Sequence, residues 1–332
     1  MQTIRVAQMG LGPIGLEVLR LLLTKPQCDL VGATDINPDL IGKDIQEILH
    51  LPHPSGYVIK GSLEKSILDW KPQVLVHTTR SHLNQVEAEL EYILKQGINI
   101  VSSTEELFYP YERDKGFCQR IDTLAKEHDV TIIGTGVNPG FAMDVLPLTL
   151  TSICTHVERL RISRVLDASN RRGPFQRKIG AGLTPDEFRE KAATGHFGHI
   201  GLLESALMVM AHLNWPVDSI SESLDPVIAK KPISTSVVNV KPGQVVGLHQ
   251  TLRMISGGTT RLLMNLEMVV GAEDPHDSVD IEGSPPINNR IEGGIFGDTA
   301  TVASLINTIP RVLAAPAGLL TMMDLPVPKV IN

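Results

Sequence analysis

Cysteine is scarce in this chain of 332 residues, which holds only Cys28, Cys118 and Cys154. Their odd number and wide spacing make neither a CxxC pair nor a disulfide framework, which is typical of a reducing compartment and predicts a cytoplasmic protein. Met1 to Arg5 lead directly into an apolar segment, so we expect no signal peptide. Apolar runs of the roughly 18 residues that span a bilayer are absent, and we therefore expect no membrane partner.

Positive charge is also in short supply. The chain carries 30 Lys and Arg against 37 Asp and Glu, a formal net charge of −7. A protein whose main partner is nucleic acid needs a positive surface, so this balance argues against such a partner.

Metal ligands are sparse as well. The pairs His50/His53 and His196/His199 lack a third candidate ligand nearby in the sequence, and we predict no metal site.

What the sequence does contain is a glycine-rich turn near its start. The apolar run Ile4–Met9 predicts a strand, and Leu16–Leu23 carries helical apolar spacing. Between them, a GxGxxG turn is typical of a dinucleotide site. Its first glycine permits the tight turn, the second lets the backbone approach the pyrophosphate, and the third lets the helix pack closely. Free N–H groups at the start of the helix bind phosphate. The predicted cofactor contacts here are Gly10, Gly12, Pro13, Ile14 and Gly15.

Further cofactor contacts follow at the ends of later strands. Asp35 ends a second strand twenty residues after Gly15, where a carboxylate accepts hydrogen bonds from the ribose hydroxyls and repels a 2′-phosphate. We therefore predict some preference for NAD, unless Lys43 or a loop arginine offsets this charge. Ligands of doubly wound sheets lie at the carboxyl ends of the strands, so Thr78 and Thr79, which end the strand 74–79, are predicted to line the cofactor. His77 is interpreted as part of that strand.

The order of strands and helices predicts the architecture. Strands and helices alternate up to residue 134, which is typical of a parallel sheet with covered faces. The loop 134–140 breaks this rhythm, and from residue 220 on come long strands without intervening helices, as in an open mixed sheet. We predict an α/β fold in which a Rossmann doubly wound parallel sheet joins an α+β domain with an open mixed sheet. The dinucleotide-binding domain covers 1–145 and is completed by 296–332, with a last helix capped by Asp298. The substrate and dimerisation domain covers 146–295.

The second half has two further local features. Thr184 and Glu187 flank Pro185 in the pattern of a capping box, which predicts a helix start. The segment 168–182 is predicted to be a long loop with Arg171, Arg172, Arg177 and Lys178. This basic cluster either holds a substrate carboxylate or phosphate, with Arg177 in the pocket, or is a solvated loop. The double proline 285–286 is predicted to end the sheet region.

Two adjacent carboxylates, Glu105 and Glu106, follow the strand 98–101 where a nicotinamide ring is expected. Consecutive extended residues point in opposite directions. One carboxylate would then face the reaction site, and the other would face solvent or the end of a helix. The alternative is that both cap the segment that follows.

Several motifs together resemble a known family. The chain is similar to the dihydrodipicolinate-reductase-like superfamily, and within it to the 2,4-diaminopentanoate dehydrogenase and native amine dehydrogenase group. True dihydrodipicolinate reductases carry an adjacent His-His pair followed by a Lys, and this sequence has no His-His pair. The matching stretches are Gly10–Gly15, Ser102–Leu107, Gly136–Phe141, Gly198–Gly201 with Glu204-Ser205, and Gly293–Asp298.

The resemblance implies reversible NAD(P)-dependent oxidative deamination of an amine or diamine, which in reverse joins a ketone to ammonium, in a homodimer. It implies that Glu105 is catalytic, because a carboxylate stabilises a cationic iminium and takes a proton from ammonium. It places Asn138 at the cofactor and Phe141 and His199 in the substrate pocket. Glu106 receives no role, so its replacement is expected to do little. Two alternatives stay open: an imine or carbonyl reductase, and a nicotinamide-binding sensor without turnover.

Overall fold

The computed structural model describes residues 3–195, 197–327 and 329–331. The chain divides into two compact units. The first comprises the chain up to Phe141 together with the segment from Phe296 onward, and the second is Ala142–Ile295. The domain boundary expected at 145/146 lies four residues inside the second unit.

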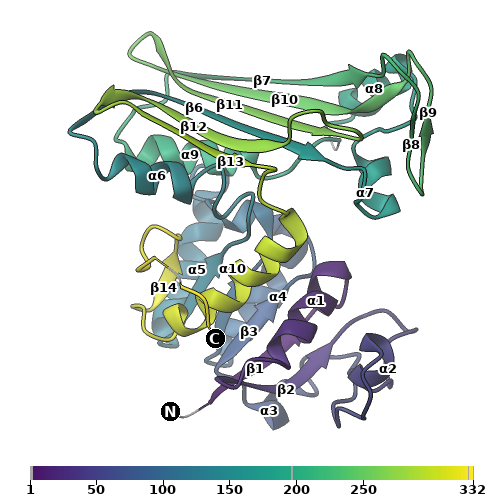
Figure 1. Ribbon diagram of the computed structural model, residues 1–332. Helices are drawn as coiled ribbons and strands as arrows, with labels where there is room; N and C mark the ends of the chain where they lie inside the picture. Colours follow the sequence, from purple (N-terminus) through teal and green to yellow (C-terminus); the bar gives the residue numbers. More distant parts are fainter. Residues whose placement is uncertain (1–2, 196, 328, 332) are drawn as a thin grey trace. The chain divides into compact units, whose positions relative to one another are not determined.

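The first unit is built on a parallel sheet of six strands in the order β14-β5-β4-β3-β1-β2 (Figure 1). Two of its central strands, β3 and β5, are buried along their whole length, as expected of a sheet covered on both faces. This confirms the predicted Rossmann sheet. The sequence pattern does not predict β14, because three residues are too few for a periodic signal. The strands are β1 Ile4–Met9, β2 Cys28–Thr34, β3 Val74–His77, β4 Asn99–Ser102, β5 Thr131–Gly134 and β14 Gly318–Leu320.

Helices cover this sheet. The helix α10 packs against α1 and contacts β3, β4 and β5, so the predicted return of the last helix is confirmed. The predicted cap is wrong: the N-cap residue is Phe296, and Asp298 is the second residue of the helix. Its carboxylate still lies near the positive end of the helix dipole. The helices are α1 Pro13–Leu22, α2 Ile45–Leu49, α3 Ile67–Trp70, α4 Leu83–Lys95, the 3₁₀ helix η1 Glu105–Leu107, α5 Lys115–Glu127 and α10 Gly297–Val312.

The second unit is built on a mixed sheet in the order β13-β12-β6-β11-β10-β7. Only the β6–β11 pair is parallel among its described strands, which confirms the predicted open mixed sheet. The sheet does not end at the double proline as predicted. The polar strand β13 follows it, and at the edge of a sheet such a strand gives little apolar signal. The strands are β6 His156–Asp167, β7 Ser219–Ile228, β10 Val245–Ser256, β11 Thr259–Val269, β12 His276–Ser284 and β13 Ile287–Glu292.

Helices lie on one face of the mixed sheet. Figure 1 draws α6 and α9 below it, and α9 packs against β10 and β11. The predicted capping box at the start of α8 is confirmed. The segment expected to be one long loop contains α7, which Pro174 helps to begin. No helix among the described residues is long and apolar enough to cross a bilayer. The remaining elements are α6 Val145–Thr151, α7 Gly173–Lys178, α8 Pro185–Ala193, α9 Leu202–His212 and the hairpin strands β8 Ile233–Ser234 and β9 Asn239–Val240.

A buried ion pair fixes the end of the second unit. Arg164 on β6 and Asp277 on β12 are 1% and 3% exposed, and their Nη1 and Oδ1 atoms lie 2.6 Å apart. Arg164 also donates to the carbonyl of Ile295, and Asp277 accepts from the Ile295 N–H. Burial lowers the pKa of Arg164, an effect that the charge of Asp277 opposes. The last residue of the unit is therefore held to its own sheet.

Candidate active site

The three glycines of the first turn have different surroundings. Gly10 has a φ of +87°, and a Cβ there would lie 2.5 Å from the carbonyl oxygen of Thr78. A Cβ on Gly15 would lie 1.9 Å from the carbonyl oxygen of Gly10, so helix α1 packs on the turn itself. A Cβ on Gly12 would have no described atom within 4 Å. Two glycines are therefore required for the fold, and the third faces open space, as a pyrophosphate requires.

The turn is held from behind by its own sheet. The Gly10 carbonyl accepts from Gln8 Nε2 at 3.0 Å and from Thr78 Oγ1 at 2.8 Å. Asp35 accepts from the Leu11 N–H. Thr78 therefore lies at the carboxyl end of its strand, as predicted, but its hydroxyl supports the turn. The sequence analysis missed Gln8, although a fully buried glutamine in the middle of an apolar strand is itself a signal.

Helix α1 begins directly at this turn. Gly12 is its N-cap residue, and Pro13, which has no N–H, stands in the first turn. The N–H groups of Ile14 and Gly15 lack carbonyl partners within the helix, because the first four N–H groups of any α-helix do. These N–H groups form the positive end of the helix dipole. The turn and the helix start fit a dinucleotide pyrophosphate.

Asp35 keeps part of its carboxylate available for further hydrogen bonds. Its Oδ1 accepts from the Asn37 N–H at 2.7 Å, and its Oδ2 accepts from Leu11. An ionised carboxylate offers about four acceptor positions, so about two are left for hydroxyl donors. The side chain is only partly buried, which leaves it accessible to a ligand.

The different surroundings of the glycines give a prediction. Gly12→Ala is expected to fold normally and to weaken NADH binding by about tenfold or more, because the new methyl group occupies the space of the pyrophosphate. Gly15→Ala is the contrast, since its methyl group would collide with the Gly10 carbonyl and lower the melting temperature. Calorimetric titration with NADH and thermal melts measure both effects. Unchanged NADH affinity in Gly12→Ala would show that no phosphate lies there.

A polar network lies at the ends of β3 and β4. His77 is fully buried, and its Nε2 lies 3.0 Å from Glu89 Oε2 and 2.9 Å from Thr79 Oγ1. Its Nδ1 lies 2.9 Å from Ser102 Oγ. His77 is thus part of the strand, as interpreted from the sequence. The hydroxyl of Thr79 is bonded within this network.

The network continues to the turn that carries the two glutamates. Ser102 Oγ donates to Thr104 Oγ1 at 3.0 Å and accepts from the Thr104 N–H at 3.1 Å. Thr104 Oγ1 also donates to the carbonyl of Arg80 at 2.8 Å. Thr104 is the N-cap residue of η1. The glutamates therefore begin a 3₁₀ helix, and the expectation that they lie in extended backbone is wrong.

Glu106 is anchored at the start of α4. Its carboxylate accepts from the Leu83 N–H at 2.8 Å and lies 2.9 Å from His82 Nδ1 and 3.1 Å from Arg113 Nη1. One carboxylate of the pair thus serves the end of a helix, as the sequence analysis allowed. Glu106 is buried and Glu105 is partly exposed. These bonds predict that loss of the Glu106 carboxylate lowers stability, and the expectation that Glu106→Gln does little to amination stays a prediction.

The loop after β5 carries a buried amide. Both the Oδ1 and the Nδ2 of Asn138 are shielded from solvent and have no hydrogen-bond partner among the described residues. The loop is tight, because Gly140 has a φ of +134° and a Cβ there would lie 2.2 Å from the Gly136 nitrogen. An unsatisfied buried amide costs free energy unless a ligand supplies the missing bonds. The carboxamide of nicotinamide offers the matching acceptor and donor. Phe141, which ends this unit, is 40% exposed.

In the second unit, the basic side chains of segment 168–182 are not equivalent. Arg171 is buried and stacks over the ring of Phe175 at 4.3 Å. Arg177 is exposed in the last turn of α7. His199 lies between two glycines in left-handed conformations, and its backbone is bonded to Gln250. His196 lies outside the described residues. The part of the chain that the structure describes holds no cluster of His, Cys, Asp and Glu side chains suited to a metal ion.

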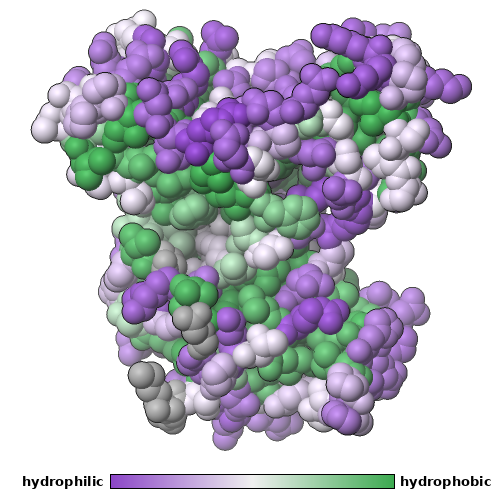
Figure 2. Space-filling model, in the orientation of Figure 1, coloured by the Kyte–Doolittle hydropathy of each residue, from purple (hydrophilic) through white to green (hydrophobic). Residues whose placement is uncertain are grey.

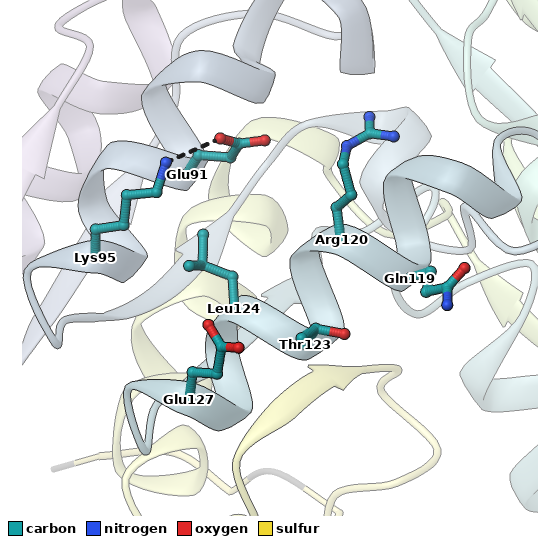
Figure 3. Close-up of a pocket in the computed structure, with 7 residues that line it drawn as sticks. All are labelled: Glu91, Lys95, Gln119, Arg120, Thr123, Leu124 and Glu127. Carbon is teal, nitrogen blue, oxygen red and sulfur yellow. Dashed lines mark hydrogen bonds and ion pairs between the residues drawn. The ribbon is translucent and has the colours of Figure 1, made fainter.

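A shallow groove lies between α4 and α5 (Figure 3). It is lined by the last turns of α4, with Glu91 and Lys95, and by the second half of α5, with Arg120. Helices of a doubly wound sheet run opposite to the strands, so these helix ends lie toward the amino ends of the strands. The cofactor residues lie at the carboxyl ends. The groove is therefore not part of the candidate active site.

Comparisons with known proteins agree with this geometry. The family model described as the 2,4-diaminopentanoate dehydrogenase C-terminal domain matches residues 141–332, and the model described as the dihydrodipicolinate reductase N-terminus matches residues 4–134. A 2,4-diaminopentanoate dehydrogenase from Acetoanaerobium sticklandii is 30% identical over 100% of this chain and 96% of its own length. An amine dehydrogenase from Streptomyces virginiae is 22% identical over 96% of this chain and 94% of its own length.

Solved structures give the same fold. An amine dehydrogenase from Mycobacterium smegmatis superposes with a TM-score of 0.86 at 23% identity and covers 98% of this chain and 97% of its own. A dihydrodipicolinate reductase from Paenisporosarcina superposes with a TM-score of 0.54 at 13% identity, covering 97% and 99% of the two chains. At these identities the likeness concerns the fold alone. The family model and the full-length relative go further: the chain belongs to the 2,4-diaminopentanoate dehydrogenase family and is an NAD(P)-dependent oxidoreductase acting on CH–NH₂ donors.

Proposed function

We propose that the chain catalyses the reversible oxidative deamination of a small amine or diamine, with Glu105 as the catalytic residue. One observation carries the proposal: Glu105 directly follows the Thr104 cap at the carboxyl end of β4, in the same sheet whose strand β1 leads into the glycine turn. Ligands of parallel sheets bind at this edge. We assign cofactor binding to the first unit, and substrate binding and dimerisation to the second.

When bound, NAD(P)H supplies the hydride. In the direction of amination, a ketone, ammonium, NAD(P)H and one proton from solvent give an ammonium product, NAD(P)⁺ and water. The carboxylate of Glu105 takes a proton from ammonium, which frees the amine for attack on the carbonyl carbon. It returns this proton to the hydroxyl group of the addition product, which leaves as water, and it then stabilises the cationic iminium. We assign Asn138 to the carboxamide of the nicotinamide, since its buried Oδ1 and Nδ2 have no described partner.

Oxidation of NADH that depends on ammonium tests this proposal. We expect a panel of small ketones, keto acids and amino ketones to include substrates whose NADH oxidation requires ammonium. The relative from Acetoanaerobium sticklandii is named for a diamino acid, so the panel includes the corresponding amino keto acid. Oxidation without ammonium would instead indicate an imine or carbonyl reductase. NADH binding without any turnover would indicate a sensor.

Cofactor preference follows from Asp35. We expect kcat/KM to be higher with NAD than with NADP, because a carboxylate at this position repels a 2′-phosphate, and measurable activity with both. Ile36, the next residue, is 76% exposed and brings no positive charge to this position. Asp35→Asn is expected to reduce the preference. A wild-type ratio in favour of NADP would mean that Asp35 does not contact the ribose.

Arg177 is proposed to approach the substrate from the second unit. Its side chain is exposed near the end of α7, so it is accessible to a ligand carboxylate. Arg177→Ala is then expected to raise KM for a keto acid about tenfold and to leave KM for an uncharged ketone nearly unchanged. Lys178→Ala, at the neighbouring exposed position, is the matched control. Equal effects of Arg177→Ala on both substrates would assign the arginine to the solvated surface.

We also propose a homodimer in the cytoplasm. The face of the mixed sheet opposite α9 carries partly buried side chains such as Thr251, Leu263 and Asn265, and a second copy would cover them. Hydrophilic residues (purple) are frequent along the top of the view in Figure 2, above the strands of this unit. Light scattering measures the mass in solution. The three cysteines, all without disulfide bonds, are compatible with a reducing compartment.

A further inference from the structure

The buried side chain of Gln250 forms hydrogen bonds to both backbone groups of His199. Gln250 lies on β10 and is 5% exposed. Its Oε1 accepts from the His199 N–H at 3.0 Å, and its Nε2 donates to the His199 carbonyl at 3.2 Å. One side chain thus satisfies both backbone groups of a residue 51 positions away in the sequence.

The orientation of this amide is fixed by a second side chain. Gln250 Nε2 also donates to Glu222 Oε1 on β7, at 2.6 Å. A carboxylate only accepts hydrogen bonds, so it selects the orientation in which the nitrogen faces Glu222 and the oxygen faces the His199 N–H. Gly198, the residue before His199, lies against the same amide. Its φ is +110°, and a Cβ there would lie 3.4 Å from Gln250 Oε1.

We infer that Gln250, oriented by Glu222, is a positioning residue that sets the place of His199 in the substrate pocket. The inference rests on the proposed function and on the expectation, implied by the family resemblance, that His199 lies in the substrate pocket. Most side chains beside a loop make one hydrogen bond to it. Here the paired bonds fix both the position and the rotation of the His199 peptide, and a misplacement of about 1 Å in a binding group costs up to about 10²-fold in rate.

The first test compares Gln250→Met with Gln244→Met. Both remove a glutamine that bridges backbone groups, since Gln244 bonds the Lys241 N–H and the Gly182 carbonyl at 2.8 Å each. We expect Gln250→Met to raise the KM of the carbonyl substrate about tenfold, to change kcat less, and to leave NADH affinity unchanged. Gln244→Met is expected to alter none of them. Equal effects of both variants on KM would mean that Gln250 serves only in packing.

A double-mutant cycle then asks whether Gln250 acts through His199. In a His199→Ala background, Gln250→Met should raise KM by less than twofold, because the side chain that it positions is gone. Gln250→Glu sets a second carboxylate against Glu222, and adding Glu222→Gln should recover part of the lost affinity. Additive effects in the cycle would overturn the inference.

Hydrogen exchange separates this inference from the proposed function. In Gln250→Met the amide of His199 is expected to exchange at least tenfold faster, while the strands of the mixed sheet keep their protection. This readout needs no substrate. If the wild type aminates no carbonyl but the His199 amide behaves as expected, the proposed function fails and the positioning of His199 stands. Unchanged exchange at His199 would refute the positioning itself.

Discussion

Replacing Glu105 by Gln is expected to lower the rate of reductive amination by about 10²–10³, because the loss of one preorganised partner of developing charge has an effect of this size. A glutamine keeps the shape of the side chain but neither takes a proton from ammonium nor offsets the charge of an iminium. Steady-state rates at saturating ketone and ammonium measure the loss. Folding and NADH affinity should survive, since Glu105 is only partly buried and lies outside the glycine turn.

Glu112→Gln is the matched control for this experiment. Glu112 lies seven residues further along in the same unit, and its exposed carboxylate forms a 3.6 Å surface pair with Lys115. We expect its rate to stay within twofold of the wild type. If Glu105→Gln aminated at the normal rate, the mechanism proposed for this site would have to be abandoned.

Replacing Glu106 by Leu is expected to lower the free energy of unfolding by about 2–3 kcal/mol. The change removes the carboxylate that accepts from the Leu83 N–H and that lies 3.1 Å from Arg113 Nη1, and breaking a buried charge pair typically costs about 3–5 kcal/mol. The Arg113 side chain is 36% exposed, so solvent recovers part of this cost. The melting temperature of the first unit is expected to fall by roughly 5 °C or more.

Glu106→Gln should have a smaller effect, because an amide oxygen still accepts from the Leu83 N–H. The control is Glu91→Gln, which removes an i,i+4 surface pair with Lys95 and should leave the melting temperature nearly unchanged. A Glu106→Leu protein as stable as the wild type would mean that these bonds do not hold η1 to α4.

Much of the fold could be predicted from the sequence because its signals are local. The glycine turn, Asp35 and the capping box at Thr184 each act within a few residues of their own elements. The mixed sheet is also predictable, since its long strands alternate. Elements without periodicity could not be predicted: β14 has three residues, and β13 is a polar edge strand.

The contacts that support the site were harder to predict from the sequence. Gln250 and His199 are 51 residues apart, and only the folded sheet brings them together. The expectation that Glu105 and Glu106 point in opposite directions assumed extended backbone, whereas both begin a 3₁₀ helix after Thr104. The position of Thr78 at a strand end indicated a ligand contact, whereas its hydroxyl donates to the Gly10 carbonyl of the glycine turn.

Incorporation of ¹⁵N from labelled ammonium tests the central claim most directly. The wild-type protein is incubated with NADH, ¹⁵N-ammonium and the carbonyl compound that gives the fastest turnover, and the product is identified by mass spectrometry. We predict one ¹⁵N-amine formed for each NADH oxidised, and a rate reduced by about 10²–10³ in Glu105→Gln. An alcohol product, or NADH oxidation that leaves ¹⁵N out of the product, would contradict the assignment as an amine dehydrogenase.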